Sequence, residues 1–351
     1  MDRRSFVVAV GGFIAGCGGT TDDRNEPTSR TETTDTPTFT TPSASPSPTP
    51  REATVEAAIE ASRSQLADAL GAIEAAEVVE DGKPGIYSED GSPGYSEGLS
   101  AAEERTVAAR ERLEAVSSDA TGERERAVER LLRLSLYLRA KRFTHRGLLN
   151  AFIDYELGVR KVQQRPGEAA EAVQQAARRF ERTNEFRARA RARLEEVDDA
   201  EGAVAVDGFD PSTERDELRA IGRIVGRFRP SATGTAAFGR TLRSLIRAQR
   251  RYEGEADYGG AGEAFRAAAT HAEAGVDPFR TAARRGIATA ARHREFACRL
   301  SELREGARTG SDAMTAFAAG DESKGEELYD RYQRTVDGVN DTCAEAGAET
   351  E

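Results

Sequence analysis

The stretch from residue 128 to residue 157 reads VERLLRLSLYLRAKRFTHRGLLNAFIDYEL and is the most apolar part of the chain. Leucine and aromatic side chains recur in it at three- and four-residue spacing, which is the period of one face of an α-helix. The large apolar residues at these positions include Leu131, Leu132, Leu138, Leu149, Phe152 and Ile153. We therefore expect this stretch to be helical and to form the central core of the fold.

The same period extends over most of the chain after residue 52. One stripe consists of Val55, Ile59, Leu66, Leu70 and Ile73, and a second begins with Val107, Leu113 and Val116. Two helix starts are also signalled: Ser100-Ala101-Ala102-Glu103 has the form of a capping box, and Asp277 stands before a proline at a first helical position. The prediction is an all-α protein of roughly eight to ten helices, packed as hairpins in a bundle or a short solenoid.

A loop from Asp198 to Ser212 interrupts this pattern and contains the one strand-like run, Ala203-Val204-Ala205-Val206. A domain boundary is expected there. The predicted helical domains are residues 52–197 and 213–351, and they follow an export signal at 1–17 and a stalk at 18–51.

The N-terminus carries a twin arginine, Arg3-Arg4, followed at once by an apolar stretch that starts at Phe6 and runs only to Ala15. This stretch is far short of the roughly 20 residues that span a bilayer. It ends in Ile14-Ala15-Gly16-Cys17, which are small residues before a cysteine. A charged start, a short apolar segment and a small-residue site predict an export signal rather than a transmembrane helix.

The segment after the cysteine is rich in threonine, serine and proline. From Thr20 to Pro50 it holds eleven Thr, four Ser and six of the 12 Pro of the chain. Such a composition cannot bury enough apolar surface to offset the entropy of ordering, so we expect a disordered stalk.

These features resemble the twin-arginine-exported lipoproteins of haloarchaea. By that resemblance, Arg3 and Arg4 are read by the translocase, Phe6 takes the apolar place after the pair, and Cys17 carries the lipid. Asp2 departs from the family, which more often has Ser or Thr there. The resemblance implies an extracytoplasmic protein anchored to the cell membrane by lipid. A net charge of −11 is compatible with a salt-adapted organism and argues against a nucleic-acid partner.

Residues 243–275 resemble one tetratricopeptide unit. Leu245, Tyr252, Tyr258, Ala261, Phe265 and Ala268 fall at the motif's spacing of large and small packing residues. The usual Trp, Gly and closing Pro are absent. In that family the concave face of paired helices binds peptides. The alternative is an unrelated helical hairpin with small and aromatic residues at good packing positions.

Cys298 and Cys343 are the only cysteines besides Cys17, and an exported protein meets conditions in which disulfides persist. Both lie in segments with helical pattern, joined by a plausible turn at Gly320-Asp321. Cys298 lies 22 residues before Gly320 and Cys343 lies 22 residues after Asp321, so the arms of an antiparallel hairpin bring the two sulfurs to one level. The prediction is a disulfide; the alternative is a pair of buried free thiols, with Gly306 and Gly310 breaking the first arm.

Motifs for catalysis are weak. Gly94-Tyr95-Ser96-Glu97-Gly98 matches the nucleophile elbow, but no apolar strand precedes it. His145, His271 and His293 are scattered, and the spacing of His293, Glu295 and Cys298 is poor for a shared metal. The arginines of the run 187–193 surround a helix and can pair with nearby glutamates, which favours a solvated helix over a binding patch. We expect no catalytic residue, no metal and no cofactor.

A long loop, Asp81 to Glu97, contains two similar segments that each hold a tyrosine, Tyr87 or Tyr95, beside a carboxylate. These tyrosines are a possible contact surface; the alternative is a tolerated duplication. The sequence thus favours a lipid-anchored helical protein that binds another protein or a ligand and is not an enzyme. The alternative is an extracytoplasmic enzyme whose active-site residues are spread along the helices without a motif.

Overall fold

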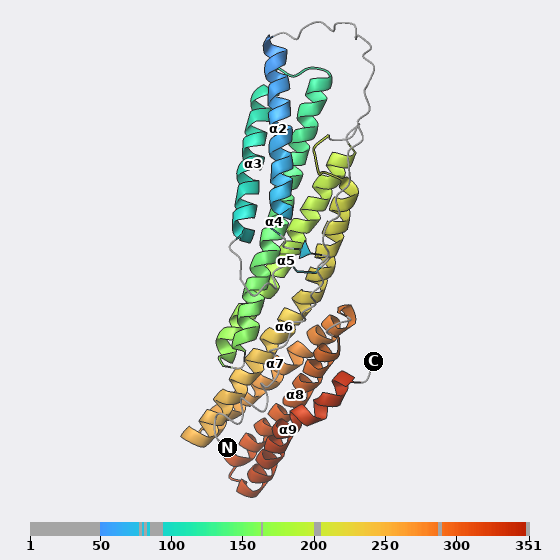
Figure 1. Cartoon of the computed structure of the whole chain (residues 1–351). Helices are drawn as coiled ribbons and strands as arrows, with labels where there is room; N and C mark the ends of the chain where they lie inside the picture. Colours follow the sequence, from blue (N-terminus) through green and yellow to red (C-terminus); the bar gives the residue numbers. More distant parts are fainter. Residues whose placement is uncertain are drawn as a thin grey trace.

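The computed structural model describes residues 50–76, 79–80, 83–84, 94–162, 164–199, 205–286 and 290–348. Within these ranges eight helices follow one another, which confirms the predicted all-α fold (Figure 1). Their bounds are α2 Pro50–Glu74, α3 Gly94–Val116, α4 Glu123–Lys161, α5 Pro166–Asp198, α6 Pro211–Glu255, α7 Tyr258–Arg285, α8 Ala290–Ala318 and α9 Glu322–Ala348. The exception is an antiparallel pair of two-residue strands, β1 (Val79–Glu80) and β2 (Lys83–Pro84). The predicted stalk lies outside the described residues except at Pro50 and Arg51, which begin α2.

The molecule is elongated, and each helix packs mainly against the next one along the chain (Figure 1). At one end α2, α3 and α4 pack together as a three-helix bundle. From α4 onward the helices form a row of hairpins that ends with α8 and α9. Packing between sequence neighbours agrees with the predicted arrangement of helical hairpins in a bundle.

Two hydrophobic cores lie along this row. The first contains buried side chains from α2 to the first half of α6, and the second contains side chains from the second half of α6 to α9, together with Val162 after α4 and Ala169 in the first turn of α5. The cores meet within α6, between Ala236 and Phe238, rather than at the loop 198–212. The independent folding of 52–197 and 213–351 stays a prediction.

Short polar residues and left-handed turns set several helix ends. Asp210 caps α6 by accepting hydrogen bonds from the backbone N–H groups of Ser212 and Thr213, with Pro211 in the first turn. Asp257 likewise accepts from the N–H of Gly260 and starts α7. Gly320, with φ of 78°, provides the predicted turn between α8 and α9.

Both helix starts predicted from capping motifs are wrong. Helix α3 begins at Gly94, and Ser100 lies inside it, where its hydroxyl donates to the carbonyl of Ser96. Asp277 and Pro278 lie inside α7. The helix continues through this proline because the apolar residues on either side, Val276 and Phe279, are buried in the second core, and this burial outweighs the lost backbone hydrogen bond.

The predicted stripes are confirmed in most positions. Every member of the α2 stripe is buried, as are most of the large residues of 128–157. The prediction of a buried position is wrong for two residues: Val107 is 45% exposed and Ile153 is 51% exposed. Each lies on the outer side of its helix, next to a buried neighbour in sequence. A run of adjacent apolar residues must place one of them outside the buried face.

Candidate functional site

Most of the predicted site residues near the N-terminus fall outside the part of the chain that the structure describes. These are Arg3, Arg4, Phe6, Cys17 and Tyr87. Tyr95 lies in the first turn of α3, but its side chain is also outside the described set. The last four residues of the expected loop 81–97 are therefore helical, and the proposed tyrosine contact surface stays a prediction.

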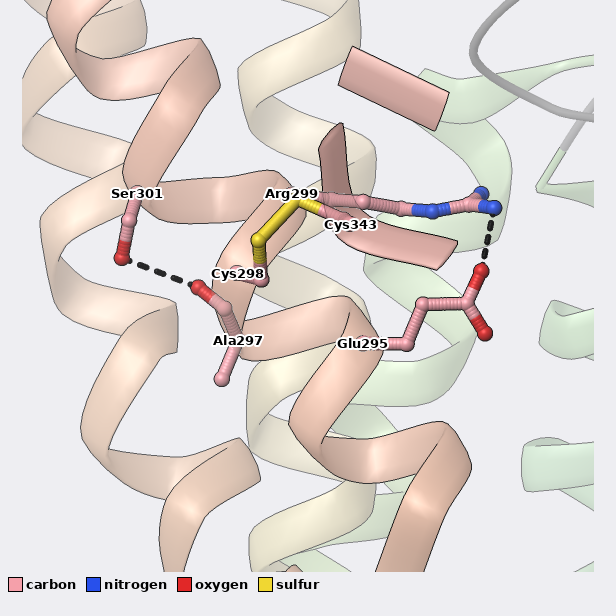
Figure 2. Close-up of a disulfide and its surroundings, with 6 residues drawn as sticks. All are labelled: Glu295, Ala297, Cys298, Arg299, Ser301 and Cys343. Atoms are coloured by element: carbon pink, nitrogen blue, oxygen red, sulfur yellow. Dashed lines mark hydrogen bonds and ion pairs between the residues drawn. A yellow bond between two sulfur atoms is a disulfide. The ribbon is translucent and has the colours of Figure 1, made fainter. Parts of the chain in front are cut away.

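The predicted disulfide is present. Cys298 on α8 and Cys343 on α9 are bonded, with their Cα atoms 5.7 Å apart (Figure 2). Helix α8 continues through Gly306 and Gly310, so the arms keep the register that the sequence indicated. A Cβ placed on Gly310 would lie 2.8 Å from the Phe265 ring, which shows that this glycine allows α7 to approach rather than breaking the helix. Beside the bond, Arg299 donates to Glu295 (Figure 2).

We predict that replacing both Cys298 and Cys343 with Ser lowers the free energy of unfolding by about 4 kcal/mol, because the bond closes a loop of 45 residues in the unfolded chain. Urea denaturation of the oxidised wild type, the reduced wild type and the double variant measures this. The reduced wild type is the matched control and should behave as the variant does. Equal stability of oxidised and reduced wild type would contradict the prediction.

A buried ionic cluster joins α4 to the first turns of α6. Tyr137, Lys141 and His145 stand four residues apart, on one face of α4. The ammonium of Lys141 lies 2.8 Å from Glu214 Oε2 and 2.7 Å from Glu217 Oε2. The Tyr137 hydroxyl donates to Glu214. Lys141 and Glu214 are almost completely inaccessible, whereas the Glu217 side chain is 22% exposed.

His145 completes the cluster. Its Nε2 lies 3.0 Å from Glu217 Oε1, at ion-pair distance but without the alignment of a hydrogen bond. Its Nδ1 is buried and has no hydrogen-bond partner in the described part of the chain. In the sequence this histidine is one of three scattered histidines with no partner at helical spacing. The structure brings it together with an acid that lies 72 positions later in the chain.

The charged forms of Glu217 and Lys141 are favoured by their neighbours in this cluster. Burial alone would raise the pKa of Glu217, but the contact with His145 and the charge of Lys141 outweigh it and hold the pKa at about 2. Burial would likewise lower the pKa of Lys141, but the two carboxylates keep it above its usual value. The pKa of Tyr137 is raised, because its burial and the neighbouring Glu214 both oppose a phenolate.

Replacing Lys141 with Met should destabilise the protein by about 3–5 kcal/mol, because the buried carboxylate of Glu214 then has no cation. The exposed Lys324 is the control, and Lys324→Met should change the unfolding free energy by less than about 0.5 kcal/mol. Guanidinium denaturation followed by circular dichroism measures both. A Lys141→Met chain as stable as the control would show that the cluster is not held by this charge.

The cluster also predicts an acid-dependent stability. The folded pKa of Glu217, about 2, lies below the reference value of 4.5, so its stabilisation is complete above pH 4.5 and is lost as the pH falls toward 2. The stability difference between wild type and Glu217→Gln should shrink over this window. Glu125→Gln, at an exposed position on α4, is the control. A difference that stays constant from pH 5 to pH 2 would refute the assignment.

A second buried polar chain links α4, α6 and α8. Tyr155 Oη lies 2.9 Å from Ser231 Oγ, which lies 3.0 Å from His293 Nε2. Burial, with the nearby charges of Arg227 and Arg292, lowers the pKa of His293 to about 4, so its ring is neutral at pH 7. In the described part of the chain, no three His, Cys, Asp or Glu side chains are placed to hold a metal ion.

An open pocket of about 600 Å³ lies where the first turn of α5 meets α6. Its lining residues are Arg165, Pro166, Gly167, Glu168, Glu171, Arg243, Ile246, Arg247 and Arg250. Two glycines bring the walls together. A Cβ on Gly239 would lie 2.8 Å from the carbonyl oxygen of Pro166, and one on Gly167 would lie 3.1 Å from Arg243 Cδ. The close approach of α5 to α6 thus depends on residues without side chains.

Neither this pocket nor the ionic cluster is among the sites predicted from the sequence. A signal for the cluster exists, because Lys141 is one of four lysines in an arginine-rich chain and falls in its most apolar stretch. A signal for the pocket is the helical spacing of Arg243, Arg247 and Arg250. Two arginines of the run 187–193 pair with nearby glutamates as expected: Arg191 contacts Glu195 and Arg193 contacts Glu196.

The predicted tetratricopeptide unit, 243–275, is a helical hairpin made of the end of α6 and most of α7. Phe265 and Ala268 are buried in it, and the rings of Tyr252 and Tyr258 lie 6.1 Å apart. The two helices have 45 and 28 residues. The likeness to tetratricopeptide proteins stays a prediction.

Comparison of the chain with family models, with curated proteins and with solved structures found no match. Among the helices that the structure describes, none combines the length and the apolar character that crossing a bilayer requires.

Proposed function

We propose that the protein is an extracytoplasmic binding protein, anchored to the cell membrane through a lipid on Cys17 and held away from it by the stalk at 18–51. The sequence basis is the twin arginine Arg3-Arg4, the short apolar segment and the small residues before Cys17. As an extended chain, the stalk would reach on the order of 100 Å, at about 3.1 Å per residue, and a flexible coil would reach roughly a third of that.

The disulfide is the observation that best supports the location. Cys298 and Cys343 are bonded across two helices, and structural disulfides persist mainly in oxidising compartments outside the cytoplasm. The third cysteine of the sequence, Cys17, is not used by this bond, which leaves its sulfur available to carry a lipid.

The open pocket between α5 and α6 supports binding as the mode of action. It is concave, lies on the surface and is lined by charged side chains that a ligand can reach. The long row of hairpins adds extended surface on both sides of the pocket, as in other repeat-like helical proteins that act by binding.

The alternative is an extracytoplasmic enzyme, and one observation favours it: Glu217 lies beside His145, with Lys141 and a second acid close by. The position of Lys141 argues for a structural role instead. Its ammonium occupies the space between the two carboxylates and is completely buried, so a substrate could not displace it without breaking the α4–α6 contact. Binding is therefore the function we propose.

Replacing Cys17 with Ser should move the chain out of the membrane fraction or leave it as unprocessed precursor, because the lipid supplies the membrane affinity. Cell fractionation and the intact mass of the purified chain measure this. As a second variant, Arg3→Lys with Arg4→Lys should block export and leave the chain inside the cell. A wild-type chain with an unmodified N-terminus would contradict the assignment.

The export-blocked chain also serves as the control for binding. Pull-down from solubilised native membranes should enrich a partner with wild type that the Arg3→Lys, Arg4→Lys chain does not recover. The same proteins in both samples would argue against an extracytoplasmic partner.

A further inference from the structure

Three arginines of the pocket share one face of α6. Arg243, Arg247 and Arg250 stand at positions i, i+4 and i+7, so their side chains project from adjacent turns toward the start of α5. Arg165 faces them from the residue before α5. Guanidinium groups from two separate elements therefore converge on one concave surface. This differs from the run 187–193, whose arginines point around the helix.

The pocket carries an excess of positive charge. Four arginines and two glutamates line it, on a chain whose net charge is −11. Each glutamate pairs with one of the arginines: Arg165 lies 3.3 Å from Glu168, and Arg243 lies 3.8 Å from Glu171.

The two remaining arginines are Arg247 and Arg250. Among the residues that the structure describes, Arg247 and Arg250 have no ion pair and no hydrogen bond, and both are exposed. A concave site lined by one sign of charge focuses its field on a ligand. Unpaired guanidinium groups offer several N–H donors each without first breaking a salt bridge.

We propose that this pocket binds a phosphate-type oxyanion, either free in solution or carried on a lipid headgroup. Arg247 and Arg250 make the main contacts, because planar guanidinium groups match the oxygen spacing of such anions in bidentate pairs. Arg165 and Arg243 remain paired with their glutamates and set the width of the pocket. The inference deepens the proposed binding function by naming the ligand chemistry, and it rests on that proposal for its setting at a membrane.

The test is direct titration of the full-length chain at low ionic strength, where surface charges are least screened. Pyrophosphate and inorganic phosphate are the free probes, measured by calorimetry. Vesicles of phosphatidylcholine with and without phosphatidylglycerol are the headgroup probes, measured by co-sedimentation. The wild type and each variant carry the same anchor, so the difference between chains reports the pocket alone.

The variants act in opposite directions. Arg247→Gln with Arg250→Gln should weaken binding of the responsive probe at least tenfold. Glu168→Gln with Glu171→Gln should strengthen it, because the competing carboxylates are removed and two more arginines become available. Arg189→Gln with Arg193→Gln, an exposed pair on α5 outside the pocket, removes the same charge and should change affinity less than twofold.

Binding of a free phosphate that depends on Arg247 and Arg250 supports the site and assigns a soluble ligand. Binding only to phosphatidylglycerol vesicles, with the same dependence, supports it and assigns a headgroup. No binding of any probe, or equal loss in the Arg189, Arg193 control, overturns the site. That result would leave the lipid-anchor proposal intact, because anchoring is judged by Cys17→Ser, and release of the chain by that variant is independent of the pocket.

Discussion

Helix α6 supplies buried side chains to both hydrophobic cores, and the rest of the structure depends on that continuity. Its first half places Ile221 and Phe228 in the first core, and its second half places Phe238 and Leu245 in the second. Because most contacts join helices that are neighbours in sequence, this 45-residue helix is the principal element that positions one core relative to the other. Pro230 lies close to the point where the cores meet and removes one backbone donor there.

The ionic cluster fixes one end of this helix. A buried lysine between two glutamates adds little net stability compared with apolar residues at all three positions, because the cost of removing three charges from water offsets their attraction. The cluster does, however, strongly destabilise other registers of α4 against α6. A slip of α4 by one turn would move Lys141 away from Glu214 and leave both charges buried and unpaired. We infer that the cluster selects the register of α4 against α6, while the apolar stripes supply the driving force.

The fold class followed from the sequence because it depends on local periodicity. The stripe in α2 follows from residue spacing within one helix. The pairing of Cys298 and Cys343 follows from their equal distance, counted in residues, from the turn at Gly320 and Asp321. The failures have a common physical origin. Capping motifs at Ser100 and Asp277 describe what a residue can do at a helix end, but burial of flanking apolar residues keeps the helix continuous through both positions. Ile153 was assigned to the core because hydrophobicity alone does not choose between adjacent residues.

The candidate sites could not be predicted from the sequence for a different reason. The partners of Lys141 lie more than 70 positions away, and the pocket joins the start of α5 to the end of α6; no local period encodes either contact. The charged residues that could have signalled these sites, Lys141 and the arginines of α6, mark only one side of each.

The positive charge of the pocket is informative because the chain as a whole is acidic. An acidic surface repels anions at long range, and salt confines that repulsion to about 10 Å at 0.1 M ionic strength. In the proposed oxyanion site, the converging arginines would therefore act at short range, on an anion that has already come close to the pocket. A tether that keeps the protein near a surface carrying such anions would provide that proximity without long-range attraction. The acidic chain and the basic pocket are therefore compatible, and together they favour a local ligand over a freely diffusing polyanion.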